Sequence, residues 1–234
     1  MVKRRIAIIP ARGGSKRLPK KNIIDFMGKP MIAWTIEAAL HSKLFNRILV
    51  STDDQEIAEV SEHYGATVPF LRKTANDDHS PVSLATCAAL QQCIEELGES
   101  YDIVTQLMPN TPLRTTQDIR QAMDYFLNNN APSQISCFRF GWMNPWWAVK
   151  LDTAGRSVPC FPEVQGKRSQ DLPALYCPTG AIWIAKTEYL VENKTFYCKD
   201  RIYHPMPWQA AIDIDDEDDL AMAKAVFMVR TQKL

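Results

Sequence analysis

The sequence predicts a single-domain α/β protein in which helices cover both faces of a mainly parallel sheet, giving three layers. Short apolar runs alternate with segments of helical apolar spacing along most of the chain, which is typical of right-handed βαβ crossovers. With 234 residues, 46% of them hydrophobic, the chain is long enough for one large core. It contains no internal repeat and no flexible linker, so residues 1–234 are read as one domain.

The predicted elements follow one another in a regular order. Residues 5–10 (RIAIIP) form a short apolar run of the kind that is buried in parallel sheets, and residues 31–42 have the apolar spacing of a helix. Further strands are expected at residues 47–52, 66–71, 102–108, 133–140 and 179–186. Further helices are expected at residues 54–65, 82–97, 116–127 and 215–230.

The alternation stops between residues 141 and 178, in a stretch that is dense in Trp and Pro. We read this stretch as an excursion from the sheet. Its aromatic side chains either cap the domain core or form a subunit interface, where Trp and Tyr are enriched. The aromatic residues in question are Trp142, Trp146, Trp147 and Phe161.

The net charge excludes some partners. The chain has 27 basic and 27 acidic residues, whereas a general nucleic-acid-binding protein would show a basic excess. No apolar run approaches the roughly 18 residues of a membrane span. The six cysteines form no CxxC pair, which argues against a zinc site and favours reduced thiols in a cytoplasmic protein. The charge is instead local, with bases in residues 1–24 and acids in residues 211–220.

The basic segment "IIPARGGSKRLPKKN" directly follows the first predicted strand. Ligands of open parallel sheets bind at the carboxyl ends of strands, so this loop should lie at the functional edge. Gly13 and Gly14 allow backbone N–H groups to approach an anion, and Arg12, Lys16 and Lys21 can bind phosphate oxygens. The loop matches neither the Walker A pattern nor GxGxxG. We therefore expect a polyphosphate here; the alternative is a solvated lysine-rich loop.

The acidic segment contains Asp213 and Asp215 on either side of the apolar Ile214. In an extended segment this spacing points both carboxylates the same way, and such oxygens bind hard cations such as Mg²⁺ together with substrate phosphates. The alternative is that Asp215 is an ordinary helix N-cap and that the acids after it complement the helix dipole.

Six motifs together resemble the acylneuraminate cytidylyltransferases, also called CMP-sialic acid synthetases, over nearly the whole chain: "IPARGGSKRLPKKNI", "GKPMIAWTIEAAL", "ILVSTDDQEIAEV", "VPFLR", "RSQDLPALYCPTGAIWI" and "IDIDDEDDL". The resemblance implies a nucleotide-diphospho-sugar transferase fold related to GT-A glycosyltransferases and a homodimer built by an inserted arm at residues 141–178. It also implies the transfer of CMP from CTP to the anomeric hydroxyl of a nonulosonic acid, with release of pyrophosphate.

The resemblance also assigns residues to roles. Arg12, Lys21, Asp213 and Asp215 are the implied catalytic residues, and the two aspartates are the implied Mg²⁺ ligands. The implied CTP-binding residues are Ala11, Arg12, Gly13, Gly14, Ser15, Lys16, Lys21, Asn22, Arg72 and Ser80. The implied sugar-binding residues are Met108, Arg168, Ser169, Gln170, Thr179 and Trp183.

The sugar side departs from the family pattern, which has Gln in place of Met108, Arg in place of Ser169, Asn in place of Thr179 and Tyr in place of Trp183. A thioether makes no strong hydrogen bond, and Met108 with Trp183 would form an apolar wall. We therefore expect a legionaminic- or pseudaminic-type acid as the acceptor. Two other classes remain open: a GT-A-type glycosyltransferase, whose DxD motif normally lies mid-chain, and a non-catalytic nucleotide-binding protein.

Overall fold

The computed structural model describes residues 3–74 and 80–231. Their main sheet has six strands in the order β10-β6-β9-β5-β1-β4. β9 pairs antiparallel with β5 and β6, and every other pairing is parallel, so the predicted mainly parallel sheet is confirmed. The strands are β1 (Arg5–Pro10), β4 (Arg47–Ser51), β5 (Ile103–Gln106), β6 (Ser133–Arg139), β9 (Tyr176–Lys186) and β10 (Ile202–Pro205).

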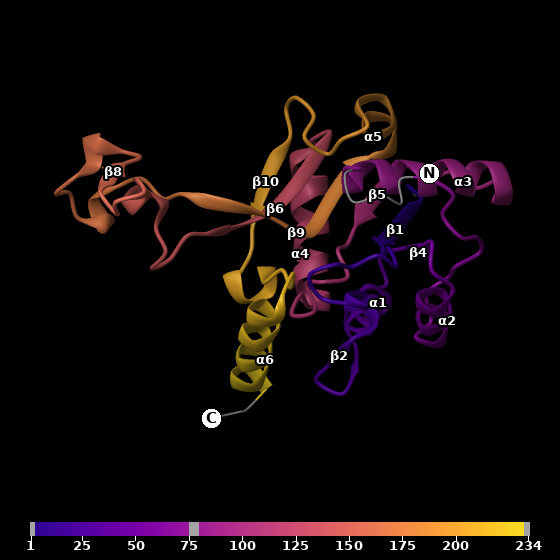
Figure 1. The fold of residues 1–234 in the computed structure, drawn as a ribbon. Helices are drawn as coiled ribbons and strands as arrows, with labels where there is room; N and C mark the ends of the chain where they lie inside the picture. The colour runs from indigo at the N-terminus through magenta and orange to yellow at the C-terminus, as the bar shows by residue number, and fades with distance from the viewer. Residues whose placement is uncertain (1–2, 75–79, 232–234) are drawn as a thin grey trace.

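Helices cover both faces of this sheet (Figure 1). Successive residues of β1 point to opposite faces: Ile6 and Ile8 pack in one core cluster, and Ala7 and Ile9 pack in the other. The first cluster includes α3 (Val82–Leu97) and α5 (Thr187–Asn193), and the second includes α1 (Met31–Ser42), α2 (Gln55–His63) and α4 (Thr116–Asn129). The predicted three-layer arrangement is therefore confirmed.

A third core cluster joins the two ends of the chain. Leu18 from the loop after β1 and Phe26 from the hairpin of β2 (Asp25–Phe26) and β3 (Lys29–Pro30) pack with Ile214 and with Leu220 of α6 (Glu217–Thr231). This cluster holds the basic loop and the acidic segment against each other, which brings the two charged regions of the sequence to one place.

Residues 141–178 project from the sheet between β6 and β9 as an arm (Figure 1). The arm contains a two-stranded sheet of β7 (Val149–Leu151) and β8 (Ser157–Pro159) and three short 3-10 helices. Within it the rings of Trp146 and Phe161 are in edge contact, with centroids 5.0 Å apart, whereas Trp142 is 87% exposed. The arm aromatics thus do not cap the domain core, which removes one of the two interpretations.

Some sequence-based elements are wrong. Residues 66–71 form no strand; only one bridge joins Leu49 to Thr67, because Pro69 has no N–H with which to continue the ladder. β9 begins at Tyr176 rather than at residue 179, and α6 begins at Glu217 rather than at residue 215. The short elements α5 and β10 were not expected.

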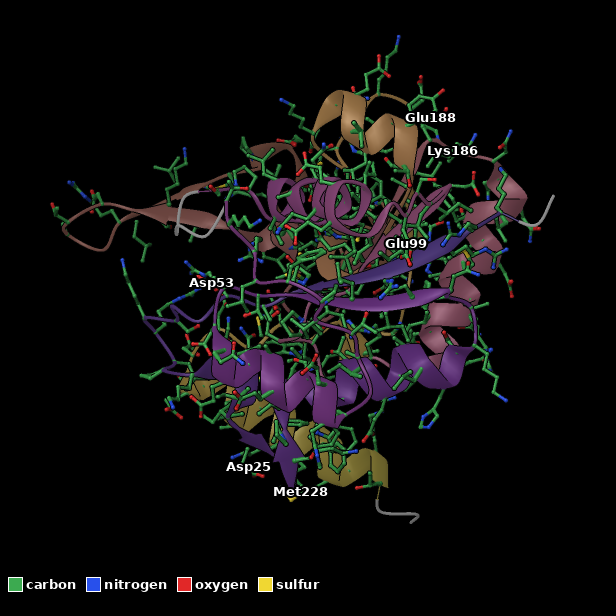
Figure 2. The ribbon with its side chains drawn as sticks, turned by 90° about the vertical axis from the view of Figure 1, so that its right-hand side faces the viewer. Asp25, Asp53, Glu99, Lys186, Glu188 and Met228 are labelled. Atoms are coloured by element: carbon green, nitrogen blue, oxygen red, sulfur yellow. The ribbon has the colours of Figure 1, made fainter. Side chains whose placement is uncertain are left out.

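In the part of the chain that the structure describes, no helix is long and apolar enough to cross a membrane. All six cysteines are unpaired. Figure 2 shows Asp53 and Glu99 at opposite ends of the strands, which distinguishes the carboxyl edge, where the site described next lies, from the opposite edge.

Candidate active site

Three contacts fix the basic loop that follows β1. The Leu18 side chain is buried in the third core cluster, and Asn22 Nδ2 donates to the carbonyl oxygen of Arg12 at 2.9 Å. The N–H of Gly13 donates to Asp53 Oδ1 at 3.0 Å. A Cβ on Gly13 would lie 2.6 Å from Asp54 Oδ2, so a residue without a side chain is required there. Asp53 thus accepts the hydrogen bond of this donor, and the role of the Gly13 N–H in binding a phosphate stays a prediction.

A cavity of about 210 Å³ lies beside this loop. It gathers residues that are far apart in the sequence, since its wall comes from the loop, from the chain after β4 and from the turn after β5. Six of the predicted CTP-binding residues and Met108 lie in the wall, which consists of Pro10, Arg12, Ser15, Lys21, Asn22, Arg72, Ser80, Val82, Ala85, Met108, Pro109 and Asn110. Of the other predicted residues, Ala11 is buried, and Gly14 and Lys16 are exposed on the loop.

Arg72 is a buried cation in this wall, only 4% exposed. Its Nη1 donates to the carbonyl oxygen of Ser51 at 2.7 Å, and its own N–H donates to the carbonyl oxygen of Thr52 at 2.7 Å. Burial lowers the pKa of the guanidinium, since removal from water disfavours the charged form. A buried positive charge at a cavity suits an anionic or polar ligand.

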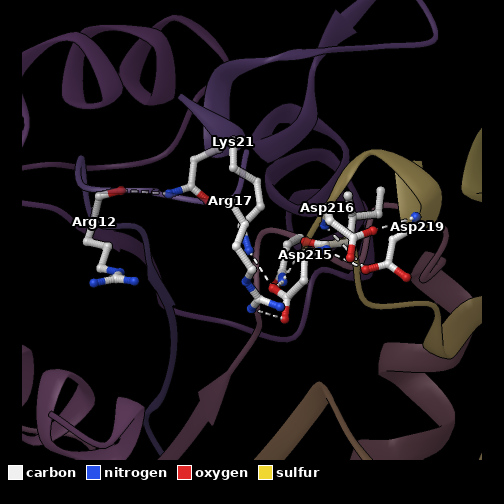
Figure 3. A network of polar contacts seen from close by, with 9 residues as sticks. Arg12, Arg17, Lys21, Asp215, Asp216 and Asp219 are labelled. Atoms are coloured by element: carbon white, nitrogen blue, oxygen red, sulfur yellow. Dashed lines mark hydrogen bonds and ion pairs between the residues drawn. The ribbon is translucent and has the colours of Figure 1, made fainter. Parts of the chain in front are cut away.

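Asp215 connects the acidic segment to the basic loop (Figure 3). Lys21 Nζ lies 2.7 Å from its Oδ1, and Arg17 Nη2 lies 2.5 Å from its Oδ2. Burial by itself would raise the pKa of Asp215, but the hydrogen bonds and charges of Lys21 and Arg17 outweigh it and lower the pKa. The carboxylate is therefore ionised and is held by two cations.

The cap of α6 is formed by other residues than Asp215. Asp216 Oδ1 accepts the N–H groups of Asp218 and Asp219, at 3.1 and 3.0 Å. Asp219 Oδ2 accepts the N–H of Asp215 at 2.9 Å. The carboxylates of Asp216 and Asp219 thus accept the main-chain N–H groups at the start of α6. The interpretation of Asp215 as an ordinary N-cap is therefore wrong.

Asp213 lies two residues before Asp215, with the fully buried Ile214 between them. The pKa of Asp213 is raised to about 6, first because the surrounding protein desolvates the carboxyl and next because Asp215 repels its charge. The side chain nevertheless has access to solvent. The two carboxylates are thus close enough to repel each other, and a cation between them would remove that repulsion.

These donors fit the chemistry of Mg²⁺. No group of three or more His, Cys, Asp or Glu side chains suited to a metal occurs among residues 3–74 and 80–231. Two carboxylates are nevertheless typical of Mg²⁺ sites, because Mg²⁺ keeps several waters and takes its remaining ligands from substrate phosphates. Nearby, the buried Oδ1 of Asn110 has no hydrogen-bond partner among these residues.

Met108 lies in the cavity wall and packs against Gly180 of β9. A Cβ on Gly180 would lie 2.9 Å from Met108 Cγ, so the absence of a side chain at Gly180 makes room for Met108. Arg114 joins the turn after β5 to β9. Its Nη1 donates to the carbonyl oxygen of Met108 at 3.2 Å and to that of Ala181 at 2.7 Å. Arg114 is only 2% exposed, and burial lowers its pKa to about 9. Its role is therefore structural.

The other predicted sugar-binding residues lie away from this cavity. Thr179 is buried and donates to the carbonyl oxygen of Ala211, and Trp183 packs on Phe196 and Tyr197. Trp183 does not line this cavity, so the apolar wall of Met108 and Trp183 stays a prediction. The predicted sugar-binding residues Arg168, Ser169 and Gln170 belong to the arm. Arg168 forms an ion pair with Asp171, and Ser169 and Gln170 line a separate cavity.

Sequence reasoning missed Arg17, Asp53 and Asn110. Arg17 belongs to the basic run, but its spacing gives no sign that it reaches Asp215. Asp53 contacts Gly13, 40 positions away, and Asn110 contacts Ile214, 104 positions away. The sequence offers no local signal for contacts between residues so far apart in the chain.

A three-layer fold with a fixed basic loop, a cavity and a carboxylate pair at the carboxyl edge of the sheet is the arrangement of an α/β nucleotidyltransferase. In comparisons with known proteins, residues 6–204 match the family model for cytidylyltransferases. The chain therefore belongs to the cytidylyltransferase family.

Relatives and solved structures agree with this assignment. The chain is 37% identical to a pseudaminic acid cytidylyltransferase of Campylobacter jejuni over 96% of each chain. It is 34% identical to a CMP-N,N'-diacetyllegionaminic acid synthase of Legionella pneumophila over 98% of each. The structure of a CMP:2-keto-3-deoxy-manno-octonic acid synthetase complexed with CTP has the same fold, with a TM-score of 0.70 at 18% identity, covering 97% of this chain and 99% of that one.

Proposed function

We propose that this protein transfers CMP from CTP to the anomeric hydroxyl of a pseudaminic- or legionaminic-type nonulosonic acid, with release of pyrophosphate. The observation that carries the proposal is the cavity in which Arg12, Lys21 and Arg72 converge, with Asp213 and Asp215 beside it. Relatives named for pseudaminic and legionaminic acids align over nearly the whole length of the chain, and this supports the acceptor class.

In the proposed reaction the main contribution of the protein is to place positively charged side chains next to the triphosphate. Arg12 and Lys21 bind the phosphate oxygens and stabilise the negative charge that grows on the departing pyrophosphate. Lys21 leaves Asp215 for the triphosphate, which makes the carboxylate available. Asp213 and Asp215 are the residues that would hold Mg²⁺, which would supply Lewis-acid polarisation of the phosphate.

Arg72 serves the nucleotide. Its guanidinium is already fixed by the main chain of Ser51, so little side-chain entropy is lost when it contacts the base or ribose. Met108 is the part of the cavity wall that faces the acceptor in this proposal, and its thioether favours a deoxygenated carbon over a hydroxyl.

We further propose that the arm forms a two-fold homodimer. It presents Trp142, Met143, Leu151 and Val158 to solvent, each more than 60% exposed, and isolated chains rarely expose so many large apolar side chains together. Such a dimer would allow the arm of one subunit, with Arg168 to Gln170, to complete the acceptor site of the other. The unpaired cysteines fit a reducing compartment such as the cytoplasm.

Pyrophosphate release on mixing the protein with CTP, Mg²⁺ and a panel of nonulosonic acids tests the activity. We expect release that depends on both CTP and the sugar, and formation of a CMP-sugar. A GT-A-type glycosyltransferase would instead consume a sugar nucleotide without releasing pyrophosphate from CTP. A non-catalytic nucleotide-binding protein would bind CTP and release nothing.

A further inference from the structure

Asn110 lies between the cavity and the acidic segment. It follows β5 by four positions and is only 3% exposed. Its main chain accepts the N–H of Ile214 at 2.9 Å, and its side-chain Nδ2 donates back to the carbonyl oxygen of Ile214 at 3.1 Å. This reciprocal pair attaches the turn after β5 to the residue between the two proposed Mg²⁺ ligands.

The same amide nitrogen also reaches Asp215. Nδ2 lies 3.5 Å from Asp215 Oδ1, the oxygen that Lys21 contacts, whereas Arg17 contacts Oδ2. Both neighbours of Nδ2 are acceptors, so the amide orientation is fixed by its surroundings. The Oδ1 of Asn110 is buried and has no partner among residues 3–74 and 80–231.

We propose that Asn110 is a positioning residue for Asp215, which rests on the metal role given to Asp215 in the proposed function. When Lys21 moves to the triphosphate, Asp215 Oδ1 loses its closest cation. Nδ2 of Asn110 then remains as a buried donor that keeps this oxygen, and the main chain at Ile214, in place for a divalent cation. Arg17 does not hold Asp215 in a fixed position, because its side chain is 66% exposed and is free to adopt other rotamers in solvent.

A polar group of this kind that orients a metal ligand changes metal affinity by about 10- to 100-fold when it is removed. The test uses Mn²⁺ as the probe and the whole protein saturated with CTP in the absence of sugar, with affinity measured by electron paramagnetic resonance. We expect Asn110→Ala to weaken Mn²⁺ binding by about tenfold or more. The Michaelis constant for CTP should change much less, since Asn110 holds the carboxylate and not the phosphates.

Asn46→Ala is the control for the loss of a side-chain hydrogen bond to the main chain, at an exposed position. Asn46 makes the same kind of reciprocal pair, giving its main-chain N–H to the carbonyl oxygen of Arg5 and accepting the N–H of Arg5 at 2.8 Å. It lies before β4, at the opposite edge of the sheet, so its loss lowers stability without touching the site. Thermal unfolding of both variants separates a loss of fold from a loss of metal binding.

A second pair of variants tests whether Asn110 acts through Asp215. In an Asp215→Asn background, adding Asn110→Ala should leave Mn²⁺ affinity unchanged. If Asp215→Asn weakens binding but Asn110→Ala behaves like Asn46→Ala, the positioning role is overturned while the proposed function stands. If Asp215→Asn itself leaves Mn²⁺ affinity unchanged, the metal assignment fails and the role of Asn110 fails with it.

Discussion

Lys21 Nζ lies 2.7 Å from Asp215 Oδ1, a contact between residues 194 positions apart that joins the two charged regions of the chain. Each group neutralises the other. In the proposed function a triphosphate competes for Lys21 and a divalent cation competes for Asp215, so each ligand would make the binding of the other easier. Lys21 and Asp215 are therefore the residues at which substitutions are most informative.

Lys21→Ala should lower kcat by about 10²- to 10³-fold, the usual effect of losing one donor to a developing negative charge. The Michaelis constant for CTP should rise by a smaller factor, because charge on the leaving group grows during the reaction. Steady-state kinetics with varied CTP measure both. Lys20→Ala is the control, since Lys20 pairs with Glu56 on the surface. Unchanged turnover with weaker CTP binding would reduce Lys21 to a ground-state contact.

Asp213→Asn and Asp215→Asn should each remove most Mg²⁺-dependent activity and leave the fold intact. Asp218→Asn should have little effect, because the side chains of Asp216 and Asp219 make the capping contacts of α6. Asp219→Ala should instead lower the free energy of unfolding by about 1 kcal/mol, the usual value for a lost cap. Mg²⁺ titrations of activity and urea unfolding distinguish these effects. Equal damage from Asp218→Asn and Asp215→Asn would contradict the assignment.

The acceptor preference should depend on Met108. A hydroxyl that faces a thioether loses a hydrogen bond, at a cost of about 1 to 3 kcal/mol, or roughly tenfold to a hundredfold in kcat/KM. We therefore expect pseudaminic or legionaminic acid to be used better than N-acetylneuraminic acid, and Met108→Gln to narrow the difference. Specificity constants for the three sugars measure this. Equal use of N-acetylneuraminic acid by the unmodified protein would refute the substrate assignment but not cytidylyl transfer.

The dimer proposal predicts that light scattering at micromolar concentration gives twice the chain mass. It also predicts complementation between subunits. Lys21→Ala and Arg168→Ala proteins, each weakly active alone, should regain activity when mixed under subunit exchange, because one site then combines an intact loop with an intact arm. A monomer in solution, or no gain on mixing, would count against a shared site.

The ion pair of Glu99 with Arg47 predicts a pH dependence of stability. The hydrogen bonds from Arg47 and Tyr101 lower the pKa of Glu99 to about 2, from a usual value of 4.5. Between these values the unfolded chain binds more protons than the folded one, so this stabilisation is present above pH 4.5 and is lost as the pH falls towards 2. Glu99→Gln should flatten that decline in urea unfolding, whereas Glu188→Gln on the exposed side of α5 should not.

The sequence predicts the layers well because apolar periodicity is a local property, and the buried residues of β1 and α1 follow it. It cannot predict the direction of β9, since an apolar run has the same pattern in parallel and antiparallel strands. The absence of a strand at residues 66–71 follows from Pro69, whose missing N–H outweighs the β-rich composition of that segment.

In the candidate site, too, only local features can be predicted from the sequence. The basic loop is such a feature, because its glycines and cations are adjacent in the chain. The sequence alone leaves open whether Asp215 caps a helix, since any of the acids from Asp213 to Asp219 has suitable chemistry; only the hydrogen bonds of Asp216 and Asp219 decide it. The contacts of Trp183 with Phe196 and Tyr197 cannot be predicted from the sequence, because residues 196 and 197 lie in a segment with no periodic pattern.

Met108 and Gly180 restrict how the acceptor preference can be re-engineered. A Cβ at position 180 would lie 2.9 Å from Met108 Cγ, so the side chain at position 108 occupies the space that a side chain at position 180 would need. Any side chain at position 180 would therefore displace a residue at position 108 whose side chain extends to a γ atom in the place of Met108 Cγ. A directed-evolution library for new sugars therefore gains by randomising position 108 while holding position 180 as glycine.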